Sequence, residues 1–226
     1  MNQNQLGKWL PILKKEFDKP YMQELNIKLL GVPDSELCPA RENIFRAYSS
    51  TPPNEVKVVI VGLDPYTSVP PAHGLSFSCE TGKTPPSLRI IFNELLRSGI
   101  HTEKRTNPNL SDWAAQGVLL LNTVLTTERK KTLAHGTWGW QEFTGATLRY
   151  LAENDRPIIF LSWGNDALDS MSKYVVPFVS SPSDKLILRS CHPAAELYGR
   201  KKFTGNNQFT FTNQWLMDKG LNPIKW

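Results

Sequence analysis

Cysteine is scarce in this sequence, and the few cysteines lie far apart. The 226 residues contain only Cys38, Cys79 and Cys191. An odd number at such wide spacing fits neither a disulfide framework nor a CxxC zinc motif. We therefore expect a protein without disulfide bonds, a bound metal ion or an iron–sulfur cluster.

Long apolar runs are also absent. No run approaches the roughly 20 residues that span a bilayer, and the N-terminal segment lacks the pattern of a signal peptide. The composition, 40% hydrophobic and 21% charged, excludes a largely disordered chain. Without repeats or low-complexity linkers, we expect residues 1–226 to form one soluble intracellular domain with no membrane association.

Glycine-rich phosphate motifs are missing as well. No GxGxxG follows any apolar run, and Gly82-Lys83-Thr84 resembles the end of a P-loop but has Phe77 where the first glycine must stand. These absences exclude the common nucleotide-binding enzymes. The charge balance of 26 basic against 21 acidic residues, a net charge of +5, instead favours a polyanionic partner.

Four short apolar runs rich in branched residues are present, each typical of a buried strand. They cover residues 56–61, 117–122, 157–162 and 185–190. Helical periodicity occupies residues 110–116, 140–153 and 166–174 between them. Apolar strands that alternate with helices predict an α/β fold, an αβα sandwich around a central four-stranded parallel sheet.

The residues directly after each predicted strand are polar and varied. They include Asp64 after the first strand, Asn122 after the second, Gly164 after the third and His192 after the fourth. Parallel α/β sheets bind their ligands at the carboxyl ends of the strands. The sequence therefore predicts a functional site in which a carboxylate, an amide and an imidazole converge.

These residues lie in motifs that are similar to those of the family 1 uracil-DNA glycosylases. The main matches are Gly62-Leu63-Asp64-Pro65-Tyr66, Gly74-Leu75-Ser76-Phe77-Ser78, Leu119-Leu120-Leu121-Asn122 and His192-Pro193. Weaker matches extend from residues 85–88 to the terminal Pro223-Ile224-Lys225-Trp226. The resemblance implies a base-excision repair enzyme that hydrolyses the N-glycosidic bond of uracil in DNA, on one αβα domain and without a cofactor.

The resemblance assigns uracil binding to Leu63, Tyr66, Phe77 and Asn122. The Asn122 amide has a donor and an acceptor that match uracil O4 and N3–H, whereas cytosine presents the opposite pattern. Phe77 would stack on the base, and Tyr66 would fill the space of a thymine methyl group. The alternatives are an asparagine that merely ends a strand and aromatic residues that only fill the core.

Bond cleavage leaves cationic character on the sugar and negative charge on the base, so the site needs an anion and a donor. By resemblance, Asp64 holds or deprotonates the attacking water and stabilises the cation. A neutral His192 donates to uracil O2. The alternatives are an Asp-Pro turn and an ordinary buried histidine.

DNA binding requires short loops that contact phosphates. The resemblance assigns this contact to Pro85, Pro86, Ser87, Gly164 and Asn165. Ser87 also has the character of an N-cap for a helix over residues 88–96. The loop after His192 would complete the DNA-binding surface with Ala194, Glu196, Leu197, Tyr198 and Arg200.

Within that loop we expect Leu197 to act as the apolar wedge in the minor groove, and Glu196 to weaken DNA binding by repelling phosphates. A solvated basic turn is the alternative. This loop, which is one residue longer than usual, departs from the family pattern. So do Leu63 and Thr67, where the family usually has glutamine and histidine.

Two other functions remain open at this stage. One is a catalytically weakened homologue that binds DNA or protein, and the other is an unrelated α/β enzyme acting on a small nucleotide. The expected partners are uracil-containing DNA, single- and double-stranded, and a protein inhibitor that mimics DNA. We expect a monomer, cytoplasmic in a bacterial or viral setting and nuclear in a eukaryote.

Overall fold

The computed structural model describes residues 1–68, 72–80 and 82–226. Its central sheet contains four parallel strands in the order β3-β2-β5-β6. Their bounds are Val118–Asn122 for β3, Val58–Gly62 for β2, Ile158–Trp163 for β5 and Lys185–Ser190 for β6. The predicted four-stranded parallel sheet is confirmed, with strand ends that shift by at most two residues.

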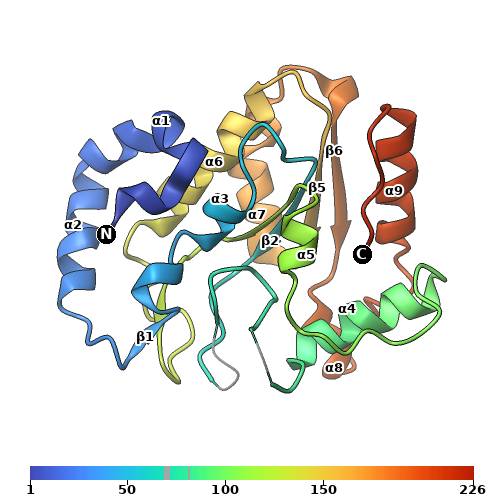
Figure 1. Cartoon of the computed structure of the whole chain (residues 1–226), viewed down its shortest axis with the longest axis horizontal. Coiled ribbons are helices and arrows are strands. Elements are labelled where there is room, and N and C mark those ends of the chain that lie inside the picture. Colours follow the sequence, from blue (N-terminus) through green and yellow to red (C-terminus); the bar gives the residue numbers. More distant parts are fainter. Residues whose placement is uncertain (69–71, 81) are drawn as a thin grey trace.

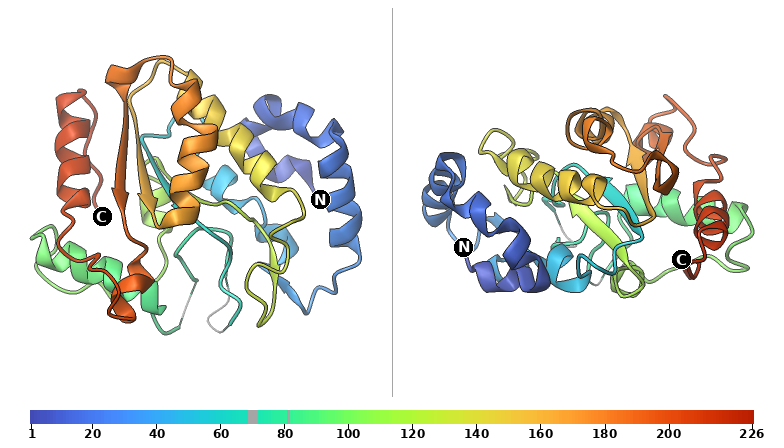
Figure 2. Two further views of the ribbon diagram at one scale, coloured as in Figure 1. Left: turned by 180° about the vertical axis from the view of Figure 1, so that it is seen from behind. Right: turned by 90° about the horizontal axis from the view of Figure 1, so that it is seen from above.

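Helices cover both faces of this sheet (Figures 1 and 2). The helices α6 and α7 lie on one face, α3 and α5 lie on the other, and α9 runs beside β6. The helix bounds are α1 Leu10–Leu13, α2 Pro20–Leu30, α3 Arg46–Ser50, α4 Pro86–Arg97, α5 Ser111–Ala114, α6 Trp140–Glu153, α7 Asn165–Tyr174, α8 Pro193–Leu197 and α9 Gln208–Asp218. The predicted αβα sandwich is therefore correct.

The strands form because their apolar side chains are buried on both faces. All residues of β2, β3 and β5 are buried, as continuous apolar strands between two helical layers require. The outer strand β6 is mostly half-buried. One cluster of buried apolar side chains extends from Leu6 to Trp226, so the two ends of the chain share the same core.

Some boundaries and elements differ from the expectations. Ser87 is not an N-cap, because α4 already begins at Pro86, and proline is favoured in a first helical turn. A two-stranded antiparallel ribbon, β1 (Leu37–Cys38) with β4 (Thr127–Glu128), was missed. Strands of two residues have no readable periodicity, so only their pairing across the fold reveals them.

No helix in the described part of the chain is long and apolar enough to cross a membrane.

Candidate active site

A cavity of about 440 Å³ opens at the carboxyl ends of the strands, where the sequence predicted a site. Parallel register places Gly62 of β2 directly beside Asn122 of β3, so the residues after these strands meet at one edge of the sheet. The residues lining the cavity include Leu63, Asp64, Tyr66, Phe77, Pro86, Ser87, Asn122, His192, Ala194, Leu197 and Tyr198. The structure thus brings all six proposed catalytic and uracil-binding residues to one cavity.

Asn122 reaches this cavity because Gly62 has no side chain. A Cβ atom at Gly62 would stand 2.2 Å from Oδ1 of Asn122 and 2.8 Å from the Cβ of Ser76. The Asn122 side chain is only 8% exposed. Its amide makes no hydrogen bond within the described part of the chain, so both its donor and its acceptor are available to a ligand.

Phe77 is held in a backbone conformation that only glycine adopts easily, with φ of 62°. Its ring lies 5.4 Å from that of Trp163 and 5.8 Å from that of His192, measured between centroids. The Tyr66 hydroxyl donates to the Phe77 carbonyl (3.0 Å). Phe77 and Tyr66 are therefore fixed relative to each other, as a rigid pocket for a flat ring requires.

The segment after Phe77 is anchored by a buried polar contact. The imidazole Nε2 of His73 and the hydroxyl of Ser78 are 2.6 Å apart. The Ser78 hydroxyl also accepts from the backbone N–H of Leu110 (2.9 Å). Burial lowers the pKa of His73 to about 4, so this histidine is neutral and structural at neutral pH.

The Asp64 carboxylate is held by a loop that follows β4. The backbone N–H of Leu133 donates to Oδ2 of Asp64 (2.7 Å), which leaves Oδ1 for another partner. Burial raises the pKa of the Asp64 carboxyl, the N–H of Leu133 opposes this rise, and the negative charge of Asp166 adds to it. The carboxylate is thus partly desolvated, so its charge acts strongly on whatever binds beside it.

His192 does not continue strand β6, which ends at Ser190, but caps the short helix α8. The backbone N–H of Ala194 donates to Nδ1 of His192 (3.1 Å). Because Nδ1 accepts, the neutral ring has its hydrogen on Nε2, where it is a donor. Burial lowers the pKa of His192, which favours this neutral form, although Asp166 opposes the shift.

Gly164, between β5 and α7, allows the turn at this point to pack against His192. It has φ of 94°, and a Cβ atom there would stand 3.0 Å from the Cβ of His192. A second cavity of about 420 Å³ lies at this turn. It is lined by Gly164, Asn165, Asp166, His192, Arg200 and Lys201 among others. The N–H groups in the first turn of a helix such as α7 favour the binding of an anion.

Helix α8 and the loop that follows it differ from the expectation in one respect. Both oxygens of Glu196 are occupied, because Oε2 accepts from the backbone N–H groups of Phe203 (2.8 Å) and Thr204 (2.7 Å), and Oε1 accepts from the Thr204 hydroxyl (2.7 Å). The Glu196 carboxylate is therefore turned toward Phe203 and Thr204 and does not project outward as expected, whereas the repulsion of phosphates by Glu196 stays a prediction. The exposed large apolar residues here are Leu197, the last residue of α8, and Tyr198 directly after it, which are 41% and 72% exposed.

Three residues that contribute to this region were missed. The N–H of Leu133 and the charge of Asp166 act on Asp64, and the buried Glu94 of α4 accepts from the N–H groups of Gly205 and Asn207. Asp166 stands two positions after Gly164, so proximity to that turn could have drawn attention to it. No sequence signal points to the Leu133 backbone or to Glu94.

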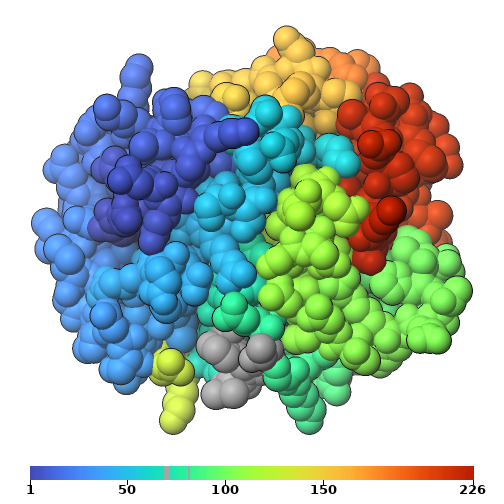
Figure 3. All heavy atoms as spheres, in the orientation of Figure 1, coloured from blue at the N-terminus to red at the C-terminus, as the bar shows by residue number. Residues whose placement is uncertain are grey.

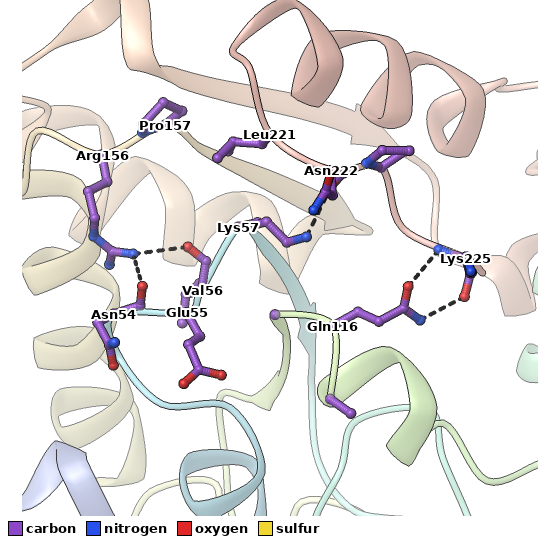
Figure 4. A pocket seen from close by; sticks show the side chains of 13 residues that line it. Asn54, Glu55, Val56, Lys57, Gln116, Arg156, Pro157, Leu221, Asn222 and Lys225 are labelled. Carbon is purple, nitrogen blue, oxygen red and sulfur yellow. Dashed lines mark hydrogen bonds between the residues drawn. The ribbon is translucent and has the colours of Figure 1, made fainter.

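Another cavity, of about 790 Å³, lies at the amino ends of strands β2, β3 and β5 (Figure 4). Several of its polar groups are already occupied. The Arg156 guanidinium donates to backbone carbonyls, Lys57 donates to the Asn222 carbonyl, and Gln116 bonds reciprocally with the backbone of Lys225. These hydrogen bonds hold the segments before β2 and β5 and the C-terminal segment together.

No group of three or more His, Cys, Asp or Glu side chains that could hold a metal ion occurs in the described residues. The fold and the site together indicate an α/β enzyme whose cavity is lined by an aromatic residue, an amide, a carboxylate and a histidine.

Comparison with known proteins makes the class specific. The family model of the uracil DNA glycosylase superfamily matches residues 48–217. The uracil-DNA glycosylase of Azotobacter vinelandii is 40% identical over 221 residues, 96% of this chain and 92% of that relative. That of Lachnoclostridium phytofermentans is 41% identical over 96% of this chain and 95% of the relative. The chain therefore belongs to the uracil DNA glycosylase superfamily.

Solved structures agree with this assignment. The crystal structure of mimivirus uracil-DNA glycosylase has a TM-score of 0.87 and 27% sequence identity, and covers 100% of this chain and 89% of that one. A mimivirus UNG variant, solved in complex with UGI, has a TM-score of 0.86 and 26% identity, and covers 100% of this chain and 91% of that one.

Proposed function

We propose that this protein excises uracil from DNA in base-excision repair, with Asp64 and His192 as its catalytic residues. The observation that carries the proposal is the single cavity lined by the Asp64 carboxylate, the Asn122 amide and a His192 ring whose Nδ1 is occupied. The reaction needs an anion near the sugar, a group that hydrogen-bonds the Watson–Crick edge of the base, and a hydrogen-bond donor at the base oxygen. Asp64, Asn122 and His192 match these needs in that order.

Asn122 reads the flipped base. Its free amide donates to uracil O4 and accepts from N3–H, and cytosine fails because its N4 is a donor and its N3 an acceptor. Phe77 stacks on the ring, Tyr66 blocks the position of a thymine methyl group, and Leu63 covers the base beside them. The missing side chain of Gly62 leaves the room that the Asn122 amide occupies.

Hydrolysis transfers the deoxyribose from the base to water. The bond between C1′ and N1 breaks, its electron pair stays on uracil, and water oxygen bonds to C1′ after losing a proton. Asp64 stabilises the sugar cation through its charge and accepts the water proton, with Leu133 fixing its orientation. The Nε2–H of His192 donates to uracil O2, where negative charge grows, so free uracil and an abasic site result.

DNA is held by short loops around the cavity. Pro85, Pro86 and Ser87 at the start of α4, and Gly164 and Asn165 at the start of α7, contact phosphates. Leu197, with Tyr198 beside it, enters the minor groove as the wedge, and Arg200 contacts a neighbouring phosphate. Ala194 lines the cavity at the base of this loop.

The same surface also suits a DNA-mimicking protein inhibitor, because the mimivirus UNG variant is described in a complex with UGI. We expect a monomer that acts on single- and double-stranded DNA, in the cytoplasm of a bacterial or virus-infected cell.

Release of free uracil from an oligonucleotide with one uracil, compared with release from dUMP, tests this function. We expect release from the oligonucleotide only. Asp64→Asn should lower the rate by two or more orders of magnitude with nearly unchanged DNA affinity, because the amide keeps the shape but loses the charge. Absence of uracil release by the wild type would refute the proposed function, and a variant within about threefold of wild type would remove Asp64 from the mechanism.

A further inference from the structure

A basic turn stands at the edge of the proposed active site, where the resemblance assigns no DNA contact. Residues 128–131 form this turn, in which the N–H of Lys131 donates to the carbonyl of Glu128 (3.1 Å). Arg129, Lys130 and Lys131 are consecutive cations, and all three are exposed. We name residues 129–131 the basic turn.

The basic turn is tied directly to the site. The backbone N–H of Lys130 donates to the carbonyl of Thr67 (2.9 Å), and Thr132, the next residue after the turn, lines the site cavity. One residue further, Leu133 donates to Asp64. The cations are therefore held at a constant position relative to the catalytic carboxylate.

The side chains of the three cations differ in whether they already have a hydrogen-bond or ion-pair partner. Arg129 donates through Nε to the carbonyl of Ser35 (2.5 Å), and Lys131 forms an ion pair with Glu128 (2.5 Å). The side chain of Lys130 has no hydrogen bond or ion pair among the described residues. Lys130 also has φ of 59°, a backbone conformation that favours glycine. The backbone conformation therefore gives no reason for a lysine at this position.

The position of the basic turn suits contact with a DNA strand that extends along one edge of the molecule. In Figure 1 the chain around residue 130 descends at the lower edge of the molecule, and α8 with its loop lies at the other end of the same edge. Figure 2 shows the same separation from behind, and in Figure 3 yellow-green atoms of this part of the chain project beyond the surface. The site cavity, lined by Thr132 on one side and Leu197 on the other, lies between them.

We propose that the basic turn, chiefly through Lys130, binds a backbone phosphate of the DNA strand on the side of the flipped nucleotide away from the Leu197 loop. This inference rests on the proposed function, because it places the strand across the same cavity. A lysine whose backbone is held near the active-site cavity attracts the polyanion, and so favours its approach to Asp64 against the repulsion between that carboxylate and the phosphates.

The test compares Lys130→Gly with Lys130→Arg. Glycine removes the charge and accepts the left-handed backbone, so the loop keeps its fold, whereas arginine keeps the charge. Lys15→Ala, an exposed lysine of the segment Lys14–Asp18 near the N-terminus, is the matched control for net charge. Equilibrium binding to uracil-free oligonucleotides is measured from low to high salt, together with uracil release from single-stranded substrate.

We expect Lys130→Gly to weaken binding several-fold at low salt and to reduce the slope of log affinity against log salt by about 0.9 on duplex and about 0.7 on single strands. Lys130→Arg and Lys15→Ala should keep the wild-type slope. In the uracil-release assay at low substrate concentration, shortening the DNA flank on one side of the uracil, but not on the other, should abolish the difference in release rate between Lys130→Gly and wild type.

A wild-type slope for Lys130→Gly would overturn the proposal, as would an equal loss in Lys15→Ala. These outcomes are independent of the proposed function, because binding is measured without turnover. If wild type binds DNA and the salt slope is smaller in Lys130→Gly, but wild type releases no uracil, the phosphate contact of Lys130 is supported and the proposed glycosylase function is refuted.

Discussion

At the scale of single residues, the proposed chemistry depends on what neighbouring groups leave free. Asn122 has an available amide because Gly62 lacks a side chain. Asp64 keeps one oxygen for water because Leu133 uses the other, and His192 presents Nε2–H because Ala194 occupies Nδ1. Each reactive group is thus positioned by a backbone N–H or by the absence of a neighbouring side chain. These groups therefore need little rearrangement during the reaction.

Asp166 gives a prediction for the pH dependence of the reaction. The mechanism needs Asp64 ionised and His192 neutral, and the negative charge of Asp166 raises the pKa of both groups. Asp166→Asn removes that charge, so both pKa values fall and each group reaches its active form at lower pH. The acid limb of kcat/KM on single-stranded DNA should therefore move to lower pH.

Asp169→Asn is the matched control, since Asp169 is exposed on the same helix and neither active-site pKa responds to it. It should leave the acid limb in place. An acid limb that stays put or moves upward in Asp166→Asn would show that this charge does not act on the catalytic pair.

At the scale of elements, helix α8 and its loop are held by two carboxylates. Glu196 accepts from Phe203 and Thr204, and the fully buried Glu94 of α4 accepts from Gly205 and Asn207. Glu94 also pairs with Arg97 at 2.8 Å. These bonds lower the pKa of Glu94 despite its burial, which otherwise raises it, so the carboxylate stays charged and holds the loop against α4.

Leu197→Ala tests the wedge at the tip of this loop. A wedge supports flipping by replacing stacking, so its loss should reduce uracil excision from duplex more than from single strands, by about tenfold in the ratio. Both rates are measured under single-turnover conditions, with Tyr198→Ala examined in parallel. Equal losses on the two substrates would show that Leu197 is not the wedge, and a duplex-specific loss confined to Tyr198→Ala would assign the role to Tyr198.

Glu196→Ala tests the anchor of the same loop. The structure reverses the expectation of tighter DNA binding, because this carboxylate holds the loop rather than facing phosphates. Its removal frees the loop, so the duplex-to-single-strand ratio should fall as in Leu197→Ala, and DNA affinity should not rise. Glu196→Gln, which keeps an acceptor oxygen for Thr204, should recover part of the ratio. Increased affinity in Glu196→Ala would restore the repulsive role.

At the scale of the whole molecule, the last residues close the core. The Trp226 ring packs against Phe209 and Trp113, at centroid distances of 4.8 Å and 5.1 Å, and is 4% exposed. Gln116 holds the backbone of Lys225 on both sides, as Figure 4 shows. The C-terminal segment is thus part of the core that supports the sheet and not a loose tail.

Trp226→Ala should lower the free energy of unfolding by about 3 kcal/mol, because it removes a large buried aromatic side chain and leaves a cavity. Urea denaturation measures this change. Lys225→Ala is the control, since only the backbone of Lys225 bonds to Gln116, and it should change stability by less than about 0.5 kcal/mol. Trp226 does not line the site cavity, so the folded variant should keep its kcat. A change in stability no larger than that of the control would contradict this account.

The sequence by itself determined the sheet and the edge where the site lies. Runs such as 117–122 are apolar enough to predict buried strands, and parallel strands end on the same side of a sheet, so Asp64, Asn122 and His192 were expected to converge. Only the tertiary structure decided how these groups are oriented. The N–H of Leu133 reaches Asp64 across 69 positions, and Glu196 turns inward to residues seven and eight positions later. Backbone donors in loops have no signature in the sequence, because every non-proline residue has the same N–H and only the folded path selects its partner.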